Sequence, residues 1–300
     1  MTLSRRSLLL GSAGVGAVLL GCSAPASPEA GPAAPDVPTT GPIPAMADLE
    51  RDFARRIGVV ALDTGSGAAV GHRPDDRFLM ASVMKALMAG FVLHRSVGDA
   101  GLLDRRVAYG PADLLSYAPV TTPRVAEGMT VAELCHAAVT VSDNTAHNLL
   151  LREAGGPAEL TAWLRELGDE VTRADRIEPG MNDVDGDLDT STPAALAATL
   201  RALVTGDALP PAERGVLDGW LRANTTGDRQ IRAGAPSGWE VGEKTGSGSA
   251  GERNDAGVLY PADGAPVALA VFTVPTGDPD DDRGEDAIAA ATRAALGELR

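Results

Sequence analysis

Ser82-Val83-Met84-Lys85 is the stretch that decides how the rest of this chain is interpreted. It opens an Ala/Leu-rich segment of helical periodicity, so Ser82 and Lys85, three residues apart, lie on one face of the predicted helix. A serine hydroxyl becomes a strong nucleophile only when a neighbouring base takes its proton. The helix N-terminus adds backbone N–H groups that suit a developing oxyanion. The spacing predicts a nucleophile and its base, although an N-cap serine beside an exposed lysine is the alternative for this pair taken alone.

A second patch, Ser142-Asp143-Asn144, precedes another segment of helical periodicity. All three residue types are favoured at helix N-caps, so a cap is one interpretation. In an acyl-transfer site the same patch could supply a hydroxyl that passes a proton to a leaving nitrogen, and an amide that orients the substrate. Both interpretations stay open for this patch alone.

Two more patches complete the set. Lys244-Thr245-Gly246 ends a strand-like run, where a cation could bind a substrate carboxylate and the glycine would let a substrate backbone come close. Glu178 with Asn182 could hold and activate a water, which is what hydrolysis of an acyl-enzyme requires.

In this order along the chain, the patches make the sequence similar to the class A serine β-lactamases, and the resemblance covers essentially everything after residue 44. The stretch Arg176-Ile177-Glu178-Pro179-Gly180-Met181-Asn182 resembles the active-site loop of that family. The resemblance implies an α+β fold of the β-lactamase/DD-peptidase type. It also implies hydrolysis of the β-lactam ring of penicillins and cephalosporins, with no cofactor and no metal ion.

The resemblance implies a catalytic role for each matching residue. Ser82 would attack the lactam carbonyl, and its backbone N–H would form the oxyanion hole with that of Ser247. Ser142 would help to protonate the departing ring nitrogen. Either Lys85 directly or Glu178 through a water would deprotonate the nucleophile, and the sequence does not decide between them.

The resemblance also assigns substrate contacts. Asn144 would bind the amide side chain of the substrate, Asn182 would share the hydrolytic water with Glu178, and Lys244 would bind the carboxylate. The residues predicted to bind substrate are Asn144, Asn182, Lys244, Thr245, Gly246, Ser247, Arg253 and Tyr117.

Two of these assignments rest on a match of position. The family supplies a carboxylate-binding arginine from either of two places, which Arg253 and Gln230 match here, so Arg253 is the predicted one. Tyr117 matches the aromatic residue that flanks the cleft entrance, and a surface aromatic on a loop is the alternative.

Two departures from the family pattern concern rate and substrate range. The stretch 183–189 is shorter than usual, although Arg176 and Asp189 could still pair across the base of the loop. Ser247 adds a hydroxyl beside the predicted oxyanion site, which favours activity on cephalosporins as well as penicillins.

The N-terminal residues 1–22 predict an export signal. Arg5 and Arg6 precede an apolar stretch, a pattern typical of the twin-arginine route. Cys22 stands where a bacterial lipobox places its lipidated cysteine, with an ordinary signal peptide as the alternative, and the Pro/Ala-rich residues 23–44 predict a tether. The protein is therefore expected on the outer face of the cytoplasmic membrane as a lipoprotein, or in the periplasm or medium if Cys22 is not lipidated.

The composition of the chain limits the classes of partner that it is expected to bind. A formal net charge of −15 opposes nucleic-acid binding. The resemblance implies small β-lactams as partners, and membrane contact only through Cys22 and a monomeric state are expected. Cys135 lies at helical spacing among apolar residues and is predicted to be a buried thiol without a disulfide. The acidic run 183–189 does not fit a calcium loop, and the histidines lack zinc-ligand spacing.

Residues 45–300 are predicted to form one catalytic domain with two lobes. Strand-like runs at both ends predict an antiparallel sheet flanked by helices, while the middle of the chain predicts an all-helical lobe. The sheet lobe would span about 45–76 and 218–300, and the helical lobe about 77–217. The expected strands are 58–63, 68–71, 239–244, 256–260 and 267–274, and the expected helices are 45–57, 83–97, 130–140, 144–154, 157–167, 193–205 and 285–299.

Two other functions share much of this pattern. A penicillin-binding DD-peptidase uses the same acylation chemistry but deacylates slowly after reacting with β-lactams, and a tethered β-lactam sensor stays acylated. Glu178 and Asn182 argue against both, because a positioned base and water serve only the second half-reaction.

Overall fold

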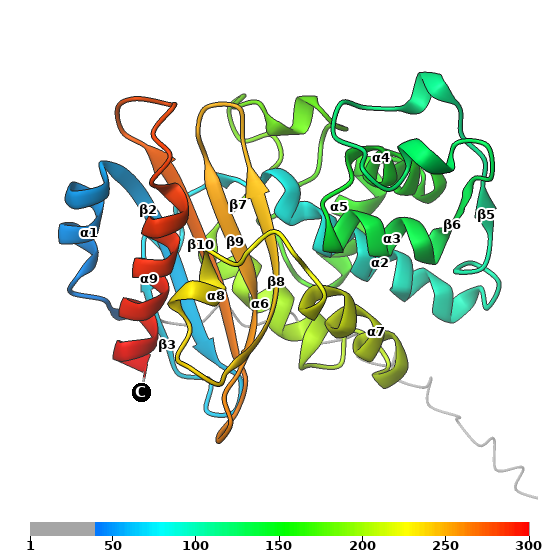
Figure 1. The fold of residues 1–300 in the computed structure, drawn as a ribbon. Coiled ribbons are helices and arrows are strands. Elements are labelled where there is room, and N and C mark those ends of the chain that lie inside the picture. The colour runs from blue at the N-terminus through cyan, green and yellow to red at the C-terminus, as the bar shows by residue number, and fades with distance from the viewer. Residues whose placement is uncertain (1–39, 300) are drawn as a thin grey trace, which may run out of the picture. The chain divides into compact units, whose positions relative to one another are not determined.

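A six-stranded sheet lies at the centre of the computed structural model, which describes residues 40–299. The expected export signal, Cys22 and most of the expected tether lie outside the described residues. The strands of the sheet are β1 (Gly41–Pro42), β2 (Arg55–Asp63), β3 (Ala69–His72), β8 (Glu240–Ser247), β9 (Arg253–Tyr260) and β10 (Val267–Pro275). Their order is β1-β3-β2-β10-β9-β8, so strands from both ends of the described chain lie side by side (Figure 1). All pairings are antiparallel except that of β1 with β3, which confirms the predicted sheet.

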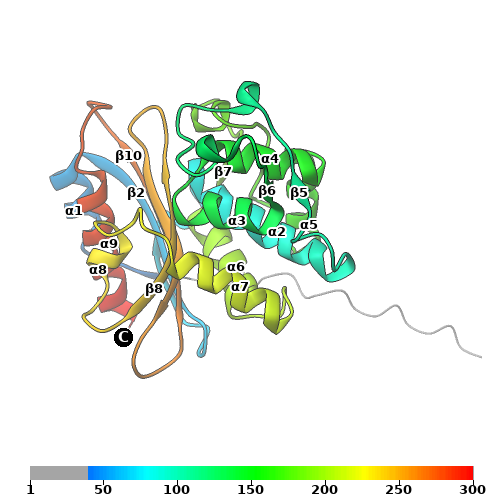
Figure 2. The same cartoon turned by 45° about the vertical axis from the view of Figure 1, so that its right-hand side comes forward.

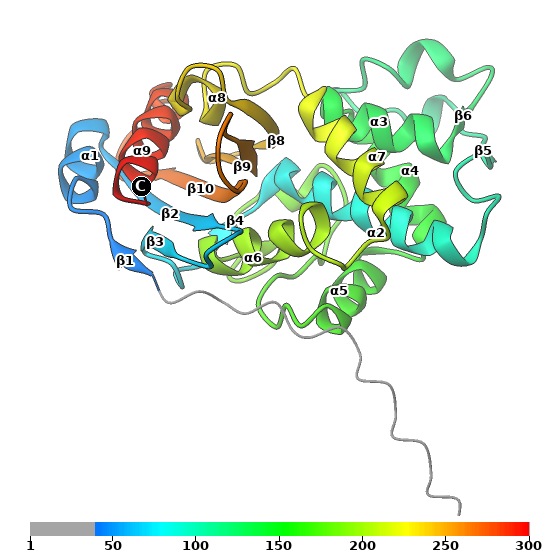
Figure 3. The ribbon, with the colours of Figure 1, turned by 90° about the horizontal axis from the view of Figure 1, so that it is seen from below.

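Both faces of this sheet are covered by helices. The helices α1 (Met46–Phe53), α8 (Ile231–Gly234) and α9 (Gly284–Leu299) lie on one face, and α6 (Pro193–Val204) lies on the other (Figure 3). Alternate side chains of β10 therefore enter two different apolar clusters, with Phe272 in one and Val271 in the other. A strand covered on both faces is apolar throughout, which is why its sequence shows no alternation.

The helical lobe is built around α2 (Met84–Gly98), whose residues 84–93 are all buried. A helix that is apolar on every side needs partners all round, and four other helices supply them (Figure 2). These are α3 (Val131–Thr140), α4 (Asn144–Ala154), α5 (Pro157–Glu166) and α7 (Pro211–Arg222). Two short two-stranded sheets complete the lobe, β4 (Phe78–Leu79) with β7 (Thr190–Ser191) and β5 (Arg106–Val107) with β6 (Met129–Thr130).

Several sequence-based boundaries were wrong. The expected helix 45–57 ends at Phe53, because Ala54 takes a left-handed conformation (φ 51°) and the chain continues directly into β2. The ordered fold begins before residue 45, since β1 pairs with β3 and Ile43 is buried. The helix α7 was not predicted, and the expected lobe boundary near residue 218 falls inside it.

Two other features bear on expectations about the chain. Cys135 is buried and unpaired as predicted, and burial raises the pKa of its thiol. Within residues 40–299, no helix is long and apolar enough to cross a membrane.

Candidate active site

The segment that carries Ser82 is held in an unusual backbone conformation. Ser82 lies in a short 3-10 helix, η1 (Ala81–Val83), that leads straight into α2. Ala81 has a positive φ of 48°, a conformation that is uncommon outside glycine and clusters at active sites. The Asn254 side chain on β9 holds the preceding backbone by donating to the carbonyls of Leu79 and Met80, at 2.8 and 3.3 Å. The nucleophile segment is therefore anchored to the sheet.

Lys85 is the centre of the site. Its side chain is 0% exposed, and its ammonium donates to Ser82 Oγ at 2.8 Å, as the three-residue spacing predicted. The same ammonium donates to Asn144 Oδ1 at 2.6 Å and to the carbonyl and hydroxyl oxygens of Ser142 at 3.1 and 3.3 Å. It also forms an ion pair with Glu178 Oε1 at 2.9 Å. Burial lowers the pKa of Lys85, against the opposing pull of Glu178, and so brings the amine closer to service as a base.

The patch at 142–144 forms the helix cap that was one of its two interpretations, and its other two residues contact Lys85. Asp143 is the N-cap of α4, where its buried carboxylate accepts from Ala146 N at 2.9 Å and also from the backbone N–H groups of Val120 and Thr121. The flanking residues Ser142 and Asn144 contact Lys85. Ser142 has a positive φ of 61°, so both sides of the catalytic lysine carry uncommon backbone geometry.

A loop brings Glu178 against Lys85 from the opposite side. Asn148, on α4, fixes the backbone of Glu178 twice, by accepting from its N–H and by donating to its carbonyl, each at 2.9 Å. The carboxylate is buried, and its Oε2 accepts a hydrogen bond from the Asn182 side chain. The structure therefore brings together the acid and amide that the sequence paired.

The base of this loop is closed by a buried carboxylate. Asp189 is 0% exposed, and its Oδ2 accepts from Arg176 Nε at 2.6 Å, the pairing that the sequence expected. Its Oδ1 accepts from the backbone N–H groups of Asp175 and Arg176 at 2.8 and 3.0 Å. The shorter stretch after Asn182 therefore still closes on itself.

The edge strand β8 forms the other wall of the site. A Cβ added to Gly246 would lie 2.6 Å from the carbonyl oxygen of Met80, so only glycine lets this strand pack against the nucleophile segment. Thr245 Oγ1 lies 2.5 Å from Thr226 Oγ1. Lys244 is buried, and burial together with the nearby Lys85 lowers its pKa to about 7. An anion bound beside this amine would favour its charged form.

A cleft of about 320 Å³ opens above these groups. Its lining contains most of the residues predicted to contact substrate, namely Tyr117, Asn144, Asn182, Thr245, Gly246 and Ser247. The predicted catalytic residues Ser82 and Ser142 also line it, together with Thr226, Gln230 and Glu285. Lys85, Glu178 and Lys244 lie beneath the cleft wall, buried. Tyr117, which lines this cleft, is half exposed at 50%.

Arg253 also lies outside the lining of this cleft, and unlike Lys85, Glu178 and Lys244 it is not fully buried. Its side-chain carbons lie against Gly284, and its Nη1 donates to the carbonyl of Glu252 at 2.8 Å. Gln230, at the alternative position, does line the cleft and is buried. The carboxylate-binding role of Arg253 stays a prediction.

Sequence reasoning missed three contributors. Asn148 was assigned only to a helix, although it positions Glu178. Thr226 and Glu285 were given no role, yet both line the cleft. Only contacts between distant parts of the chain distinguish these residues from ordinary helix and loop positions.

A buried carboxyl pair lies on the strands beside Lys244. Glu243 on β8 and Asp255 on β9 are both 0% exposed, and burial with their mutual repulsion raises the pKa of Glu243 well above its usual range. Burial therefore favours the protonated form of Glu243, whose Oε1 lies 3.2 Å from Arg232 Nη2. A folded state that holds a proton that the unfolded chain releases near pH 4.5 loses stability as the pH rises above that value.

We expect Glu243→Gln to remove this loss. The neutral amide cannot ionise, so the free energy of unfolding of the variant relative to the parent should rise steadily from pH 5 to pH 9, by at most about 1.4 kcal/mol per pH unit. The melting temperature of the variant relative to the parent should rise with it. Thermal unfolding across this range measures it. The control is Glu240→Gln on the same strand, which removes a carboxylate that is 73% exposed and so tests the loss of one negative charge without burial. Parallel pH curves for parent and Glu243→Gln would refute the raised pKa of Glu243.

These features define a class of protein, a serine acyl-transfer enzyme with a buried lysine that contacts both its serine and a buried glutamate. The family model described as Beta-lactamase enzyme family matches residues 43–299. The chain belongs to this family, and its similarity to class A members places it among the class A serine β-lactamases.

Individual relatives are similar over most of the chain. Beta-lactamase FAR-1 of Nocardia farcinica is 51% identical over 257 residues, covering 85% of this chain and 82% of that protein. The carbapenem-hydrolyzing β-lactamase KPC of Klebsiella oxytoca is 47% identical over 254 residues, covering 84% and 86%. Among solved structures, a class A β-lactamase from Mycobacterium abscessus superposes with a TM-score of 0.83 at 51% identity, covering 85% of this chain and 98% of that one.

Proposed function

We propose that this enzyme hydrolyses penicillins and cephalosporins through an acyl-enzyme on Ser82. One observation carries the proposal: a single buried ammonium, that of Lys85, contacts both the nucleophile Ser82 and the carboxylate Glu178. The nucleophile of the first half-reaction and the base of the second are thereby held in one network.

Acylation begins when Ser82 Oγ attacks the lactam carbonyl. The proton leaves Ser82 either for Lys85, which already lies 2.8 Å away, or for Glu178 through a water. The backbone N–H groups of Ser82 and Ser247 stabilise the oxyanion. Ser142, whose hydroxyl contacts Lys85, returns a proton to the ring nitrogen as the C–N bond breaks.

Deacylation uses the opposite wall of the site. Glu178 accepts a proton from a water that Asn182 helps to hold, and the resulting hydroxide attacks the ester carbonyl. The ester C–O bond then breaks and Ser82 recovers its proton. Lys244 and Thr245 bind the carboxylate of the substrate, and Asn144 orients its amide side chain.

A chromogenic cephalosporin tests the proposal directly. The purified protein should turn over many equivalents, and the adduct on Ser82, followed by mass spectrometry, should decay within the turnover time. Release of one equivalent followed by a stable adduct would instead indicate a DD-peptidase or a sensor. The contact between Glu178 and Asn182 argues against both of these alternatives.

A further inference from the structure

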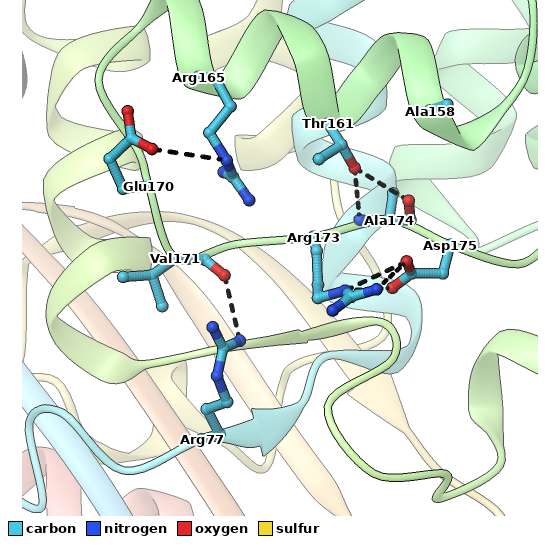
Figure 4. Close-up of a pocket in the computed structure, with 9 residues that line it drawn as sticks. All are labelled: Arg77, Ala158, Thr161, Arg165, Glu170, Val171, Arg173, Ala174 and Asp175. Carbon is cyan, nitrogen blue, oxygen red and sulfur yellow. Dashed lines mark hydrogen bonds and ion pairs between the residues drawn. The ribbon is translucent and has the colours of Figure 1, made fainter.

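A cavity of about 440 Å³ lies against α5 and shares no lining residue with the catalytic cleft. Three arginines from separate parts of the chain line it: Arg165 from α5, Arg77 from just before β4, and Arg173 from the segment that leads into the Glu178 loop. Figure 4 shows Arg165 directed toward Arg77 across the cavity, with Arg173 beside them. The three guanidinium groups therefore face a common space.

Bonds to the protein fix two of these side chains. Arg77 Nη1 donates to the Val171 carbonyl at 3.1 Å and to Thr190 Oγ1 at 2.9 Å. Arg165 Nη1 donates to the carbonyl of Asp169. Both guanidinium groups are half-buried, so their orientation is set before any ligand arrives.

Arg173 is fixed in the same way by Asp175, to which its Nε and Nη2 donate at 2.8 and 2.6 Å. Each arginine nevertheless has one terminal nitrogen that makes no hydrogen bond to the described residues. Among residues 40–299, no hydrogen-bond acceptor is found for Arg77 Nη2, Arg165 Nη2 or Arg173 Nη1. A guanidinium group has donors only, so these three nitrogens can donate hydrogen bonds to a ligand that carries acceptors.

The acidic groups near the cavity do not fully neutralise the positive charge of its three arginines. Glu170 lies 3.9 Å from Arg165 Nε with a side chain that is 76% exposed, and Asp187 lies 3.7 Å from Arg77 Nε and is 65% exposed. Exposed pairs of this kind are weak and are easily displaced. Asp175, the third acid, has Oδ2 engaged by Arg173 and by the backbone N–H of Asp189.

We propose that this arginine cavity binds a small phosphate-type anion with at least two charged oxygens. Planar guanidinium groups match phosphate oxygens in geometry and charge, and three of them converge here. The chain as a whole carries a charge of −15 and repels anions, so the arginines make the cavity a local region of positive potential on an acidic protein. The proposal concerns binding alone and does not depend on the reaction at Ser82.

Calorimetric titration of the full-length protein with inorganic pyrophosphate tests the site. We expect one saturable site per chain that weakens as salt is added. Ala158 is an exposed residue of the cavity wall in the first turn of α5, so Ala158→Glu places a negative charge there without disturbing the core. We expect Ala158→Glu and Arg165→Gln each to weaken binding at least about tenfold. The matched control Ala158→Gln, which has the same size and no charge, should stay within about twofold.

Four outcomes would overturn the proposal. The first is the lack of saturable binding, and the second is binding that Ala158→Glu and Arg165→Gln leave unchanged. The third is competition between pyrophosphate and a chromogenic cephalosporin, which would place the anion in the catalytic cleft. The fourth is binding to phosphatidylglycerol vesicles without binding to soluble pyrophosphate, which would assign the arginines to a lipid headgroup.

Discussion

Glu178→Gln should stop the enzyme after its first half-reaction. The amide keeps the size of the side chain and a donor or acceptor for Asn182, but it cannot take a proton from water. Because a positioned general base contributes roughly 10²–10⁴-fold, deacylation should slow by that factor while acylation stays within about threefold of the parent. Stopped-flow measurement of the burst, with mass spectrometry of the Ser82 adduct, separates the two rates.

The same experiment decides which group activates the nucleophile. An acylation rate close to that of the parent would assign this role to Lys85, which is our expectation from the direct 2.8 Å contact. Equal losses in both steps would assign it to Glu178 acting through water. If neither rate changed, Glu178 would not be the hydrolytic base. Glu298→Gln, an exposed carboxylate on α9, is the control for the loss of one negative charge.

Lys85→Met should abolish acylation. Methionine matches the length of the lysine stem but offers no proton acceptor to Ser82 and no donor to Ser142 or Asn144. In serine hydrolases the loss of the activating base costs about as much as the loss of the nucleophile, roughly 10⁶-fold in turnover. We therefore expect at least about a 10⁴-fold fall in the acylation rate, measured as adduct formation on Ser82.

Stability must be measured with this variant, because Lys85→Met leaves the carboxylate of Glu178 buried without its cation. Removing one partner of a buried ion pair typically costs about 3–5 kcal/mol. The double variant Lys85→Met with Glu178→Gln removes both charges and should recover most of the melting temperature without recovering acylation. A folded Lys85→Met protein that acylates at the parent rate would exclude Lys85 as the base.

The contact between the proposed nucleophile and its lysine could be predicted from the sequence, because local spacing places the two residues together. Ser82 and Lys85 share a helical face at three residues apart, and the structure confirms their contact. Five of the six strands of the sheet were equally accessible, since apolar runs bounded by turns mark them even without alternation, whereas β1 was assigned to the tether. The wrong helix end at Ala54 shows the limit, because an alanine in a left-handed conformation leaves no signal comparable to glycine.

Other features depend on contacts between residues far apart in the chain. Asn148 and Glu178 are 30 positions apart, and no pattern in either segment predicts the two hydrogen bonds between them. Glu243 and Asp255 are close only because β8 and β9 are adjacent strands, so the raised pKa of Glu243 cannot be foreseen from either residue. The arginine cavity likewise combines three segments whose arginines look like ordinary surface cations in the sequence.

The chain contains two lysines, Lys85 and Lys244, and both are fully buried in the catalytic site. Every solvent-facing cation of residues 40–299 is therefore an arginine or a histidine, and that surface presents no primary amine. Amine-directed reagents such as succinimidyl esters should leave this surface unmodified, so coupling to dyes or beads through lysine would proceed only by entering the site. For the same reason, digestion with a lysine-specific protease should be confined to unfolded molecules, which makes resistance to it a simple readout of whether the catalytic core is intact.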